Sequence, residues 1–435
     1  MLVDCGLFQG MKALRARNWE PFAVEAASID AVLLTHAHVD HAGYLPALVR
    51  AGFRGPVFAT RGTAALCAIV LPDSGRIHEE DARYANRKGF SKHEPALPLY
   101  TEEDAREALS RFREIPFGCE LEVADGVHAT AAPAGHILGA ASIWLRVEGE
   151  RERRLLVSGD LGRAEHPILA PPAPPQASDA VLIESTYGDR DHADEGHLEQ
   201  MAAAVARVAG RGGVVVIPAF AVDRTEIVLL HLRRLLEAGR IPDLPVYVDS
   251  PMALAALAVY RRAIAEGWEE IRPELRGREA LFDTGRLREV RDADASRALN
   301  RRKGPFVVIS ASGMATGGRV LHHLRARLPD ARSGVLLVGY QAAGTRGRRL
   351  LAGERELKMH GRCVPVRAEV VDLSGFSAHA DADDLLAWLA SCASAPEVAY
   401  VVHGESGPAQ ALAARVREEL GWTAAVPVHG ERVPI

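Results

Sequence analysis

Four side chains that commonly bind metal ions lie within six residues of one another. The segment THAHVDH (residues 35–41) follows a short apolar run that predicts a buried strand. Alternate side chains of an extended segment share a face, so His36 and His38 would point to one spot, while Asp40 and His41, at the turn into a helix, would reach a second. Imidazole and carboxylate suit zinc or a similar divalent cation. The segment predicts a metal centre, with a solvated histidine cluster as the alternative.

Two cations need more ligands than this segment offers. Further candidates, each after an apolar strand-like run, are His136, Asp160 and His403. Asp160 is the best bridge, because a carboxylate has two oxygens and can join ions about 3.5–4 Å apart, the spacing that two-metal hydrolases use. A lone histidine is more often a core or surface group than a ligand. The combination is what favours a two-metal site.

The elements that must position these residues follow an α/β pattern. Short apolar runs alternate with segments of helical periodicity along the whole chain. Strands are expected at residues 31–35, 154–158, 180–183, 213–217, 306–309, 335–338 and 398–402, and helices at 195–209, 224–238, 381–392 and 409–420. Several of the expected strands end in a polar or ionisable residue, where loops stay accessible while the sheet holds them.

The composition is that of a globular protein. The chain has 435 residues, of which 48% are hydrophobic and 25% charged, with a formal charge of −5, so we expect two or three domains. This charge argues against indiscriminate coating of nucleic acid but leaves room for a local basic groove. No apolar run approaches the roughly 20 residues of a bilayer span, so we expect no membrane partner and a cytoplasmic location.

The five cysteines suggest neither a zinc ribbon nor a disulfide framework. They are widely separated, odd in number and contain no CxxC pair, which predicts reduced and mostly buried thiols. They are Cys5, Cys67, Cys119, Cys363 and Cys392.

The ordered motifs resemble the metallo-β-lactamase superfamily. The likeness rests on HAHVDH at residues 36–41, on the later Gly-His136 and Ser-Gly-Asp160, and on VHGE at 402–405. The β-CASP branch of this superfamily, a group of RNA-processing nucleases related to the endonuclease that cuts messenger RNA precursors at their 3′ ends, has three further motifs. Similar segments here are ESTYGD (184–189), SGFSAHAD (374–381) and VHG (402–404), with PAFAVDR (218–224), DSPM (249–252) and SASGMATGGR (310–319) between them.

The resemblance implies an α/β architecture in two parts. A metallo-β-lactamase αββα sandwich would comprise residues 1–190 and 367–435, and an inserted α/β β-CASP domain would comprise residues 191–366. The cleft between them would admit a single strand and exclude duplex. Family members carry additional strands before the equivalent of Asp4, so N-terminal strands are apparently missing here, which would leave a sheet edge uncovered.

The resemblance also implies a zinc-dependent ribonuclease acting on single-stranded RNA, with a hydroxide that bridges two metals as the nucleophile and a histidine as general acid. Each chain would bind two Zn²⁺, although the ligands could also accept Mn²⁺. By resemblance, the first zinc is held by His36, His38 and His136, the second by Asp40, His41 and His403, with Asp160 between them. Asp4 would support a ligand histidine from behind. A homodimer is an open option.

His379 is the candidate general acid, with Glu184 as its partner. A neighbouring carboxylate favours the imidazolium, which can then donate a proton to the leaving oxygen. A helix N-terminus disfavours a positive imidazole, so without that carboxylate the position would make a poor acid. The alternative is a non-catalytic neighbour of the helix that begins near Asp381.

Substrate contacts are expected from two further segments. Ser377 could bond a phosphate oxygen or cap its own loop. The glycine-rich stretch at 310–319, with Ser310, Ser312, Gly313 and Arg319, suits a phosphate-binding loop, although such turns are common. Between residues 340 and 367 seven basic residues stand against two acidic ones, which predicts either a contact to RNA phosphates or a solvated helix face.

Other functions remain in competition with a ribonuclease. A metallo-β-lactamase hydrolase of another substrate, a DNA strand or a small-molecule ester or thioester, would use the same metal ligands. The insert of roughly 180 residues argues against a small substrate, and DNA-acting relatives usually lack a histidine at the position of His403. A non-catalytic scaffold is the remaining class. The sequence leaves endonuclease and 5′–3′ exonuclease modes equally open.

Overall fold

The computed structural model describes residues 1–89, 91–191, 196–278 and 280–435. The chain forms two compact units, which we call the sandwich domain (Met1–Asp191 with His379–Ile435) and the inserted domain (His192–Ala378). The α/β fold class expected from the sequence is confirmed. The domain boundaries expected after residues 190 and 366 stay a prediction. Strand β17 (Glu369–Asp372), which lies beyond the second boundary, pairs with a strand of the inserted domain.

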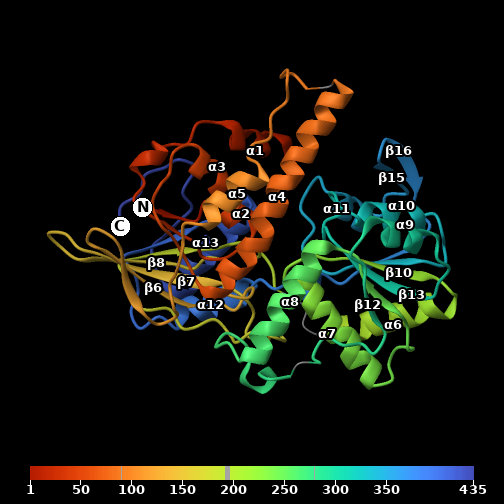
Figure 1. The fold of residues 1–435 in the computed structure, drawn as a ribbon. Coiled ribbons are helices and arrows are strands. Elements are labelled where there is room, and N and C mark those ends of the chain that lie inside the picture. The colour runs from red at the N-terminus through yellow and green to blue at the C-terminus, as the bar shows by residue number, and fades with distance from the viewer. Residues whose placement is uncertain (90, 192–195, 279) are drawn as a thin grey trace. The chain divides into compact units, whose positions relative to one another are not determined.

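Two sheets build the sandwich domain (Figure 1). The parallel sheet has the order β1-β2-β3-β4, with β1 Leu2–Val3, β2 Val32–Leu33, β3 Val57–Ala59 and β4 Phe112–Glu114. The larger sheet has the order β19-β18-β9-β8-β7-β6-β5, with β5 Glu120–Ala124, β6 Val127–Pro133, β7 Ala141–Val147, β8 Arg153–Val157, β9 Ala180–Ile183, β18 Val398–Val401 and β19 Ala424–Ala425. Leu33 of one sheet and Ile143 and Leu145 of the other meet in one buried cluster between them.

Helices flank these sheets. They are α1 Lys12–Ala16, α2 Val39–Ala42, α3 Leu45–Arg50, α4 Arg61–Lys88, α5 Glu102–Leu109, α12 Ala382–Ala390 and α13 Ser406–Leu420, with short 3₁₀ turns at Arg17–Trp19 and Ala26–Ser28. The 28-residue α4 has no counterpart among the expected helices, and Pro72 lies inside it. Its ends are well defined, because the Thr60 side chain accepts a hydrogen bond from the Thr63 amide and Gly89 adopts a left-handed conformation.

The inserted domain is built on a six-stranded parallel sheet of order β12-β11-β13-β10-β14-β17. Its other strands are β10 Val214–Pro218, β11 Val246–Val248, β12 Leu287–Glu289, β13 Phe306–Ser310 and β14 Gly334–Leu337, with the antiparallel hairpin β15 Glu356–Met359 and β16 Arg362–Pro365 beside them. The helices are α6 His197–Gly210, α7 Arg224–Glu237, α8 Pro251–Glu266, α9 Ala293–Arg301, α10 Val320–Arg327 and α11 Arg346–Leu351, with 3₁₀ turns at Pro273–Leu275 and Ser374–Phe376.

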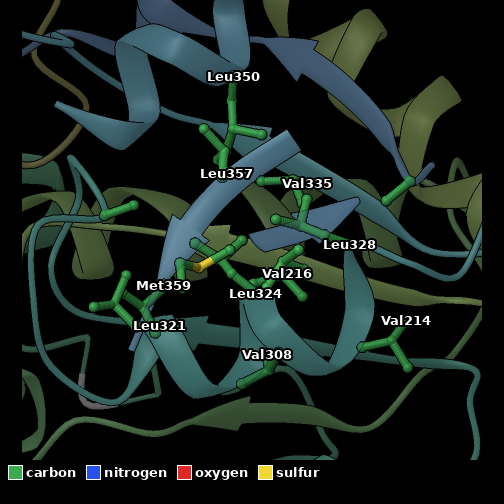
Figure 2. Close-up of a cluster of buried hydrophobic side chains, with 14 of the residues drawn as sticks. Val214, Val216, Val308, Leu321, Leu324, Leu328, Val335, Leu350, Leu357 and Met359 are labelled. Atoms are coloured by element: carbon green, nitrogen blue, oxygen red, sulfur yellow. The ribbon is translucent and has the colours of Figure 1, made fainter. Parts of the chain in front are cut away.

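Figure 2 shows the core of the inserted domain, in which leucines of α10 pack on valines of the sheet. Val216 of β10 lies in register with Val308 of β13 and Val335 of β14. Since both faces of such a sheet are covered, its strands read as continuous apolar runs. This explains why the sequence located β10, β13 and β14, whereas the shorter or more polar β11, β12 and β17 were not expected.

Two further expectations concern the thiols and the membrane. The cysteines are free, but only Cys5 and Cys67 are buried; Cys119 and Cys363 are exposed, so the expectation of mostly buried thiols is wrong. Cys119 directly precedes β5, and Cys363 lies in β16 of the two-stranded hairpin. None of the helices that the described residues form is long and apolar enough to cross a bilayer.

Candidate metal centre

One edge of the larger sheet collects the candidate ligands. Strands β8, β9 and β18 are mutually parallel neighbours, so the loops after them lie at the same edge. Strand β7 runs antiparallel to β8, which brings the β6–β7 turn to that edge too. These four loops carry Asp160, Glu184, His403 and His136. The HAHVDH segment arrives from the other sheet, after β2.

The first ligand group comprises His36, His38, His136 and Asp160, whose ligand atoms lie within 4.8 Å of one another. The Nδ1 atom of His38 is 3.0 Å from His36 Nε2 and 3.3 Å from His136 Nε2. The Oδ2 atom of Asp160 lies 3.5 and 3.7 Å from the same two Nε2 atoms. Three imidazole nitrogens facing one carboxylate oxygen form a nitrogen-rich site that suits zinc.

The second ligand group comprises Asp40, His41 and His403, again within 4.8 Å of one another. Helix α2 carries Asp40 and His41, and the Nε2 atoms of His41 and His403 are 3.2 Å apart. The other oxygen of Asp160, Oδ1, lies 3.2 Å from His41 Nε2 and 3.4 Å from His403 Nε2. Each carboxylate oxygen of Asp160 therefore faces a different group.

The surroundings of Asp160 fit a pair of cations. Its Oδ1 atom is buried and accepts no hydrogen bond from the residues that the structure describes. A buried carboxylate oxygen without a donor is costly unless a positive charge approaches it. The turn that presents this side chain depends on Gly159, which has φ +58° and no room for a Cβ, since that atom would lie 2.8 Å from Thr35 Cβ.

Protonation in the two groups also suits metal binding. Burial lowers the pKa of every histidine in the first group, so these rings stay neutral and keep a lone pair for a cation. Burial alone would lower the pKa of His41 as well, but the carboxylates of Asp160 and Asp4 raise it well above its usual value. The charges that attract a proton to His41 would equally attract a divalent cation.

Asp4 orients two of the candidate ligands, His41 directly and His36 through Thr35. Its Oδ2 atom is 2.6 Å from His41 Nδ1, which places the ring hydrogen on Nδ1 and leaves the Nε2 lone pair directed at the second group. The same oxygen accepts a hydrogen bond from the Thr35 hydroxyl at 2.8 Å. The Thr35 oxygen lies 3.0 Å from His36 Nδ1 and can accept that ring hydrogen in turn.

Thr35 is a positioning residue, whereas the sequence predicted only the end of a strand at this position. Through its hydroxyl, Asp4 orients His36 in addition to His41. The sequence feature that could have identified Thr35 is its hydroxyl group immediately before His36, the first candidate ligand. Asp4 itself adopts a left-handed φ of +61°, an uncommon conformation that is often found at functional sites.

Glu184 and His379 lie beside the ligands. The buried carboxylate of Glu184 accepts hydrogen bonds from the Leu161 amide at 2.6 Å and the Thr186 amide at 3.3 Å, so its orientation is fixed. His379 Nδ1 lies 3.6 Å from Glu184 Oε1 and 3.8 Å from Asp160 Oδ2, at ion-pair distance from both. The expected proximity of the two residues is thus present, and the backbone of His379 is bridged to that of Gly162.

The loop after β9 also holds His403 in place. The Ser185 hydroxyl donates to the Val402 carbonyl at 2.8 Å, and the Thr186 hydroxyl donates to the His403 carbonyl at 3.4 Å. A Cβ at residue 404 would lie 2.3 Å from Ser185 Oγ, so only glycine fits this approach. The ESTYGD and VHG motifs therefore support each other structurally.

The expected substrate-binding residues of the 310–319 segment turn toward their own domain. The Arg319 guanidinium donates to Asp249 Oδ1 at 2.7 Å and to the carbonyls of Val290 and Arg291. The buried Ser310 hydroxyl donates to the Asp249 carbonyl at 2.7 Å. These contacts give both residues a structural role inside the inserted domain, and their contact with a phosphate stays a prediction.

The remaining members of that set have local roles too. Ser312 Oγ accepts a hydrogen bond from the Thr316 amide at 3.0 Å, and a Cβ at Gly313 would lie 2.7 Å from the Phe220 ring. Ser377 is buried and belongs to the inserted domain. All five residues belong to the inserted domain, and their contact with substrate stays a prediction.

The basic segment between residues 340 and 367 is partly used internally. Arg346 donates to the carbonyls of Ala315 and Lys358, and Arg349 pairs with Glu354. The other basic residues of the segment are exposed; they are Arg348, Arg355, Lys358, Arg362 and Arg367. Both interpretations of the segment thus remain open.

Three family models match successive parts of the chain. Residues 1–218 match a beta-lactamase superfamily domain, residues 225–350 match the Beta-Casp domain, and residues 364–427 match a Zn-dependent metallo-hydrolase RNA specificity domain. The first model covers both the HAHVDH segment and Asp160, and the third covers His379 and His403.

Similar proteins span the full length of the chain. Ribonuclease TTHA0252 from Thermus thermophilus is 39% identical over 437 residues, which cover 100% of this chain and 94% of that protein. An RNase J-like protein from Methanocaldococcus jannaschii is 30% identical, with 100% of this chain and 94% of the relative covered. The transcription termination factor FttA of the same organism is also 30% identical, over 100% of this chain and 68% of its own length.

Proposed function

The chain belongs to the β-CASP ribonuclease family of the metallo-β-lactamase superfamily and is a hydrolase, and from this premise we propose that it cleaves the phosphodiester bonds of single-stranded RNA. We further propose that it does so with two zinc ions, which manganese could replace. The seven ligands would be His36, His38, Asp40, His41, His136, Asp160 and His403.

One observation carries the proposal, namely the position of Asp160. Its Oδ2 atom faces the first ligand group and its Oδ1 atom faces the second, all within one domain. A structural site would close around a single ion, whereas a shared carboxylate is typical of a pair. Two cations held there would neutralise charge on a phosphate and lower the pKa of a water molecule, so that hydroxide would be available near neutral pH to attack the phosphorus.

His379 supplies the remaining requirement, a proton for the leaving oxygen. Glu184 is immobilised by two backbone amides, and its Oε1 atom lies near His379 Nδ1. The carboxylates of Glu184 and Asp160 favour a hydrogen on Nδ1, which leaves Nε2 as the atom that donates to the substrate. Glu184 is a positioning residue in this scheme, and His379 is the catalytic acid.

The test compares metal content and turnover in one variant. His379→Ala should retain both zinc ions by mass spectrometry of metals and lose about 10²–10⁴-fold in kcat on single-stranded RNA. Glu184→Gln should lose less, because the amide can still contact the ring. Normal turnover of the His379→Ala protein would remove the assignment of the acid.

Substrate class is tested with matched oligonucleotides. End-labelled RNA, DNA of the same sequence and an RNA duplex should be cleaved in that order, with the duplex resistant. The fragment ladder of the 5′-labelled RNA distinguishes release of mononucleotides from internal cleavage. Light scattering of the same protein sample measures its molecular mass and so tests the homodimer. Cleavage of DNA at a rate equal to that of RNA would overturn the proposed preference.

A further inference from the structure

Among the described residues, four of the ten large apolar side chains that are exposed lie in one short N-terminal stretch. Residues 19–25 are all exposed, and they include Trp19 at 62%, Phe22 at 36% and Val24 at 50% exposure. Helix α1 precedes them without a single buried residue, and Met11 at its start is 61% exposed. We call residues 11–24 the aromatic segment. Clustered exposure of large apolar groups usually marks a binding surface.

The aromatic segment is held in a defined place. The Asn18 side chain accepts a hydrogen bond from the Phe8 amide at 2.8 Å and donates to the Phe8 carbonyl at 2.9 Å, which closes the loop between them. The Leu7 amide donates to the Val39 carbonyl at 2.8 Å. Val39 is the first residue of α2, the helix that carries Asp40 and His41. The segment is thus connected, through residues 7 and 8, to the helix that carries two of the candidate ligands.

Aromatic rings continue from this segment toward the ligands. The Phe22 and Tyr44 rings stack with centroids 5.8 Å apart and planes inclined by 19°. Tyr44 follows α2 closely, three positions after His41, and its amide donates to the Cys5 carbonyl. This stacked pair and the exposed indole of Trp19, three positions before Phe22, place three aromatic rings in or beside the aromatic segment.

Positive charge accompanies these rings. Lys12 and Arg15 are exposed on α1, and the Arg17 guanidinium lies 5.5 Å from the Phe8 ring centroid. Glu20 is the one acidic residue in the sequence of the aromatic segment, and Glu25 directly follows the segment. Exposed aromatic faces interleaved with cations are what proteins offer to single-stranded nucleic acid, because every base has a face that can stack and every nucleotide carries a phosphate.

We propose that the aromatic segment, together with Tyr44, is a base-stacking surface that binds single-stranded RNA beside the metal centre. This inference rests on the proposed function and adds the path by which RNA reaches the ligands. Bases would stack on Trp19 and on the Phe22–Tyr44 pair, while Lys12 and Arg17 contact phosphates. A duplex has its bases already stacked on one another and could not use this surface.

The experiment compares two double variants of the full chain. Trp19→Ala with Phe22→Ala removes the surface, and Tyr84→Ala with Leu97→Ala removes an aromatic and an aliphatic group that are similarly exposed elsewhere in the same domain. Binding of a fluorescent single-stranded RNA is measured by anisotropy in EDTA, so that no cleavage occurs. The first pair should weaken binding by about tenfold or more, and the second by less than about twofold.

Kinetics and a conservative variant distinguish stacking from a general loss of structure. With metal present, the Trp19→Ala, Phe22→Ala protein should show a raised KM and a kcat within about twofold of the parent. Trp19→Phe with Phe22→Tyr keeps two flat rings and should restore most of the affinity. Equal RNA affinity of the parent and the alanine variant would overturn the proposal.

Three further outcomes are informative. If the alanine variant changes from dimer to monomer in light scattering while its RNA affinity stays constant, the segment is a contact between copies of the chain and the proposal is overturned. If the parent protein binds RNA through this segment but cleaves no RNA, the proposed function fails and the binding surface stands. If the parent cleaves RNA and the variant binds it normally, only the present inference fails.

Discussion

Two buried aspartates, one in each domain, show two different uses of a carboxylate. Asp160 in the sandwich domain and Asp249 in the inserted domain both follow a parallel strand and both lie near histidines. Both Asp249 oxygens accept hydrogen bonds, from Ser296 at 2.6 Å and His323 at 2.7 Å on one and from Arg319 at 2.7 Å on the other. Asp160 has the opposite environment, with an oxygen that accepts none from the described residues.

The electrostatics of the two sites differ in the same way. Burial raises the pKa of Asp249, but hydrogen bonds from His323, Ser296 and Arg319 outweigh it and hold the pKa below its usual value. Burial also opposes ionisation of Asp160, whose pKa is held well below the usual range by imidazoles, chiefly that of His403. A carboxylate satisfied by hydrogen bonds stabilises its domain, whereas one surrounded by candidate metal ligands has the environment that a cation site requires.

The largest effect is expected at Asp160, the ligand that we propose two cations share. Asp160→Asn removes the charge and leaves only one oxygen, so two cations can no longer share it, and kcat/KM should fall at least about a thousandfold. Metal analysis should show fewer than two ions per chain. EDTA should lower the melting temperature of the parent protein but hardly affect the variant, since a ligand stabilises only the state that binds it. A fully loaded, active variant would contradict the comparison.

Asp249→Asn should affect stability and leave the metal centre intact. Removing one partner of a buried ion pair costs about 3 kcal/mol, because Arg319 would lose its counter-charge. The urea midpoint should fall by a similar amount with and without EDTA, while the metal content stays unchanged. Asp330→Asn, which alters a more exposed aspartate paired with Arg332 in the same domain, is the control and should change little. Loss of metal in the Asp249→Asn protein would contradict the assignment.

Asp4→Asn tests the support behind the ligands. Asparagine tolerates the left-handed backbone at this position and can still contact His41, but the charge is lost. Cation affinity, measured by competition with a chromophoric chelator, should fall by about 10–100-fold. The exposed Asp30→Asn provides the control. An unchanged affinity would mean that the negative charge of Asp4 does not matter.

Thr35→Val should have the smallest effect. Valine keeps the shape of threonine but removes the oxygen that faces His36 Nδ1, while Asp4 still contacts His41 directly. Cation affinity should therefore fall by about tenfold, less than in Asp4→Asn. The absorption spectrum of the cobalt-substituted protein reports whether the His36 geometry has changed. A loss larger than that of Asp4→Asn would show that the hydroxyl acts independently of Asp4.

Local sequence located many of the elements. The expected strand at 180–183 coincides with β9, and the expected helix at 224–238 ends one residue beyond α7. Runs of buried β-branched residues and a helical period are local signals, and they survive in the tertiary structure. Helix α4 was missed because its second half is charged and exposed and a proline lies within it, so no continuous apolar stripe marks its length.

The sequence by itself determined the types and order of the candidate ligands, because HAHVDH places four of them within six consecutive residues and the later candidates each follow a strand. Only the tertiary structure decided that Asp160 faces two groups, that Asp4 and Thr35 orient the histidines, and that Arg319 is bonded to Asp249. These facts depend on which strands become neighbours and on which donor and acceptor groups are thereby brought within hydrogen-bonding distance. Residue spacing along a chain does not contain that information, since sheet pairing joins residues hundreds of positions apart.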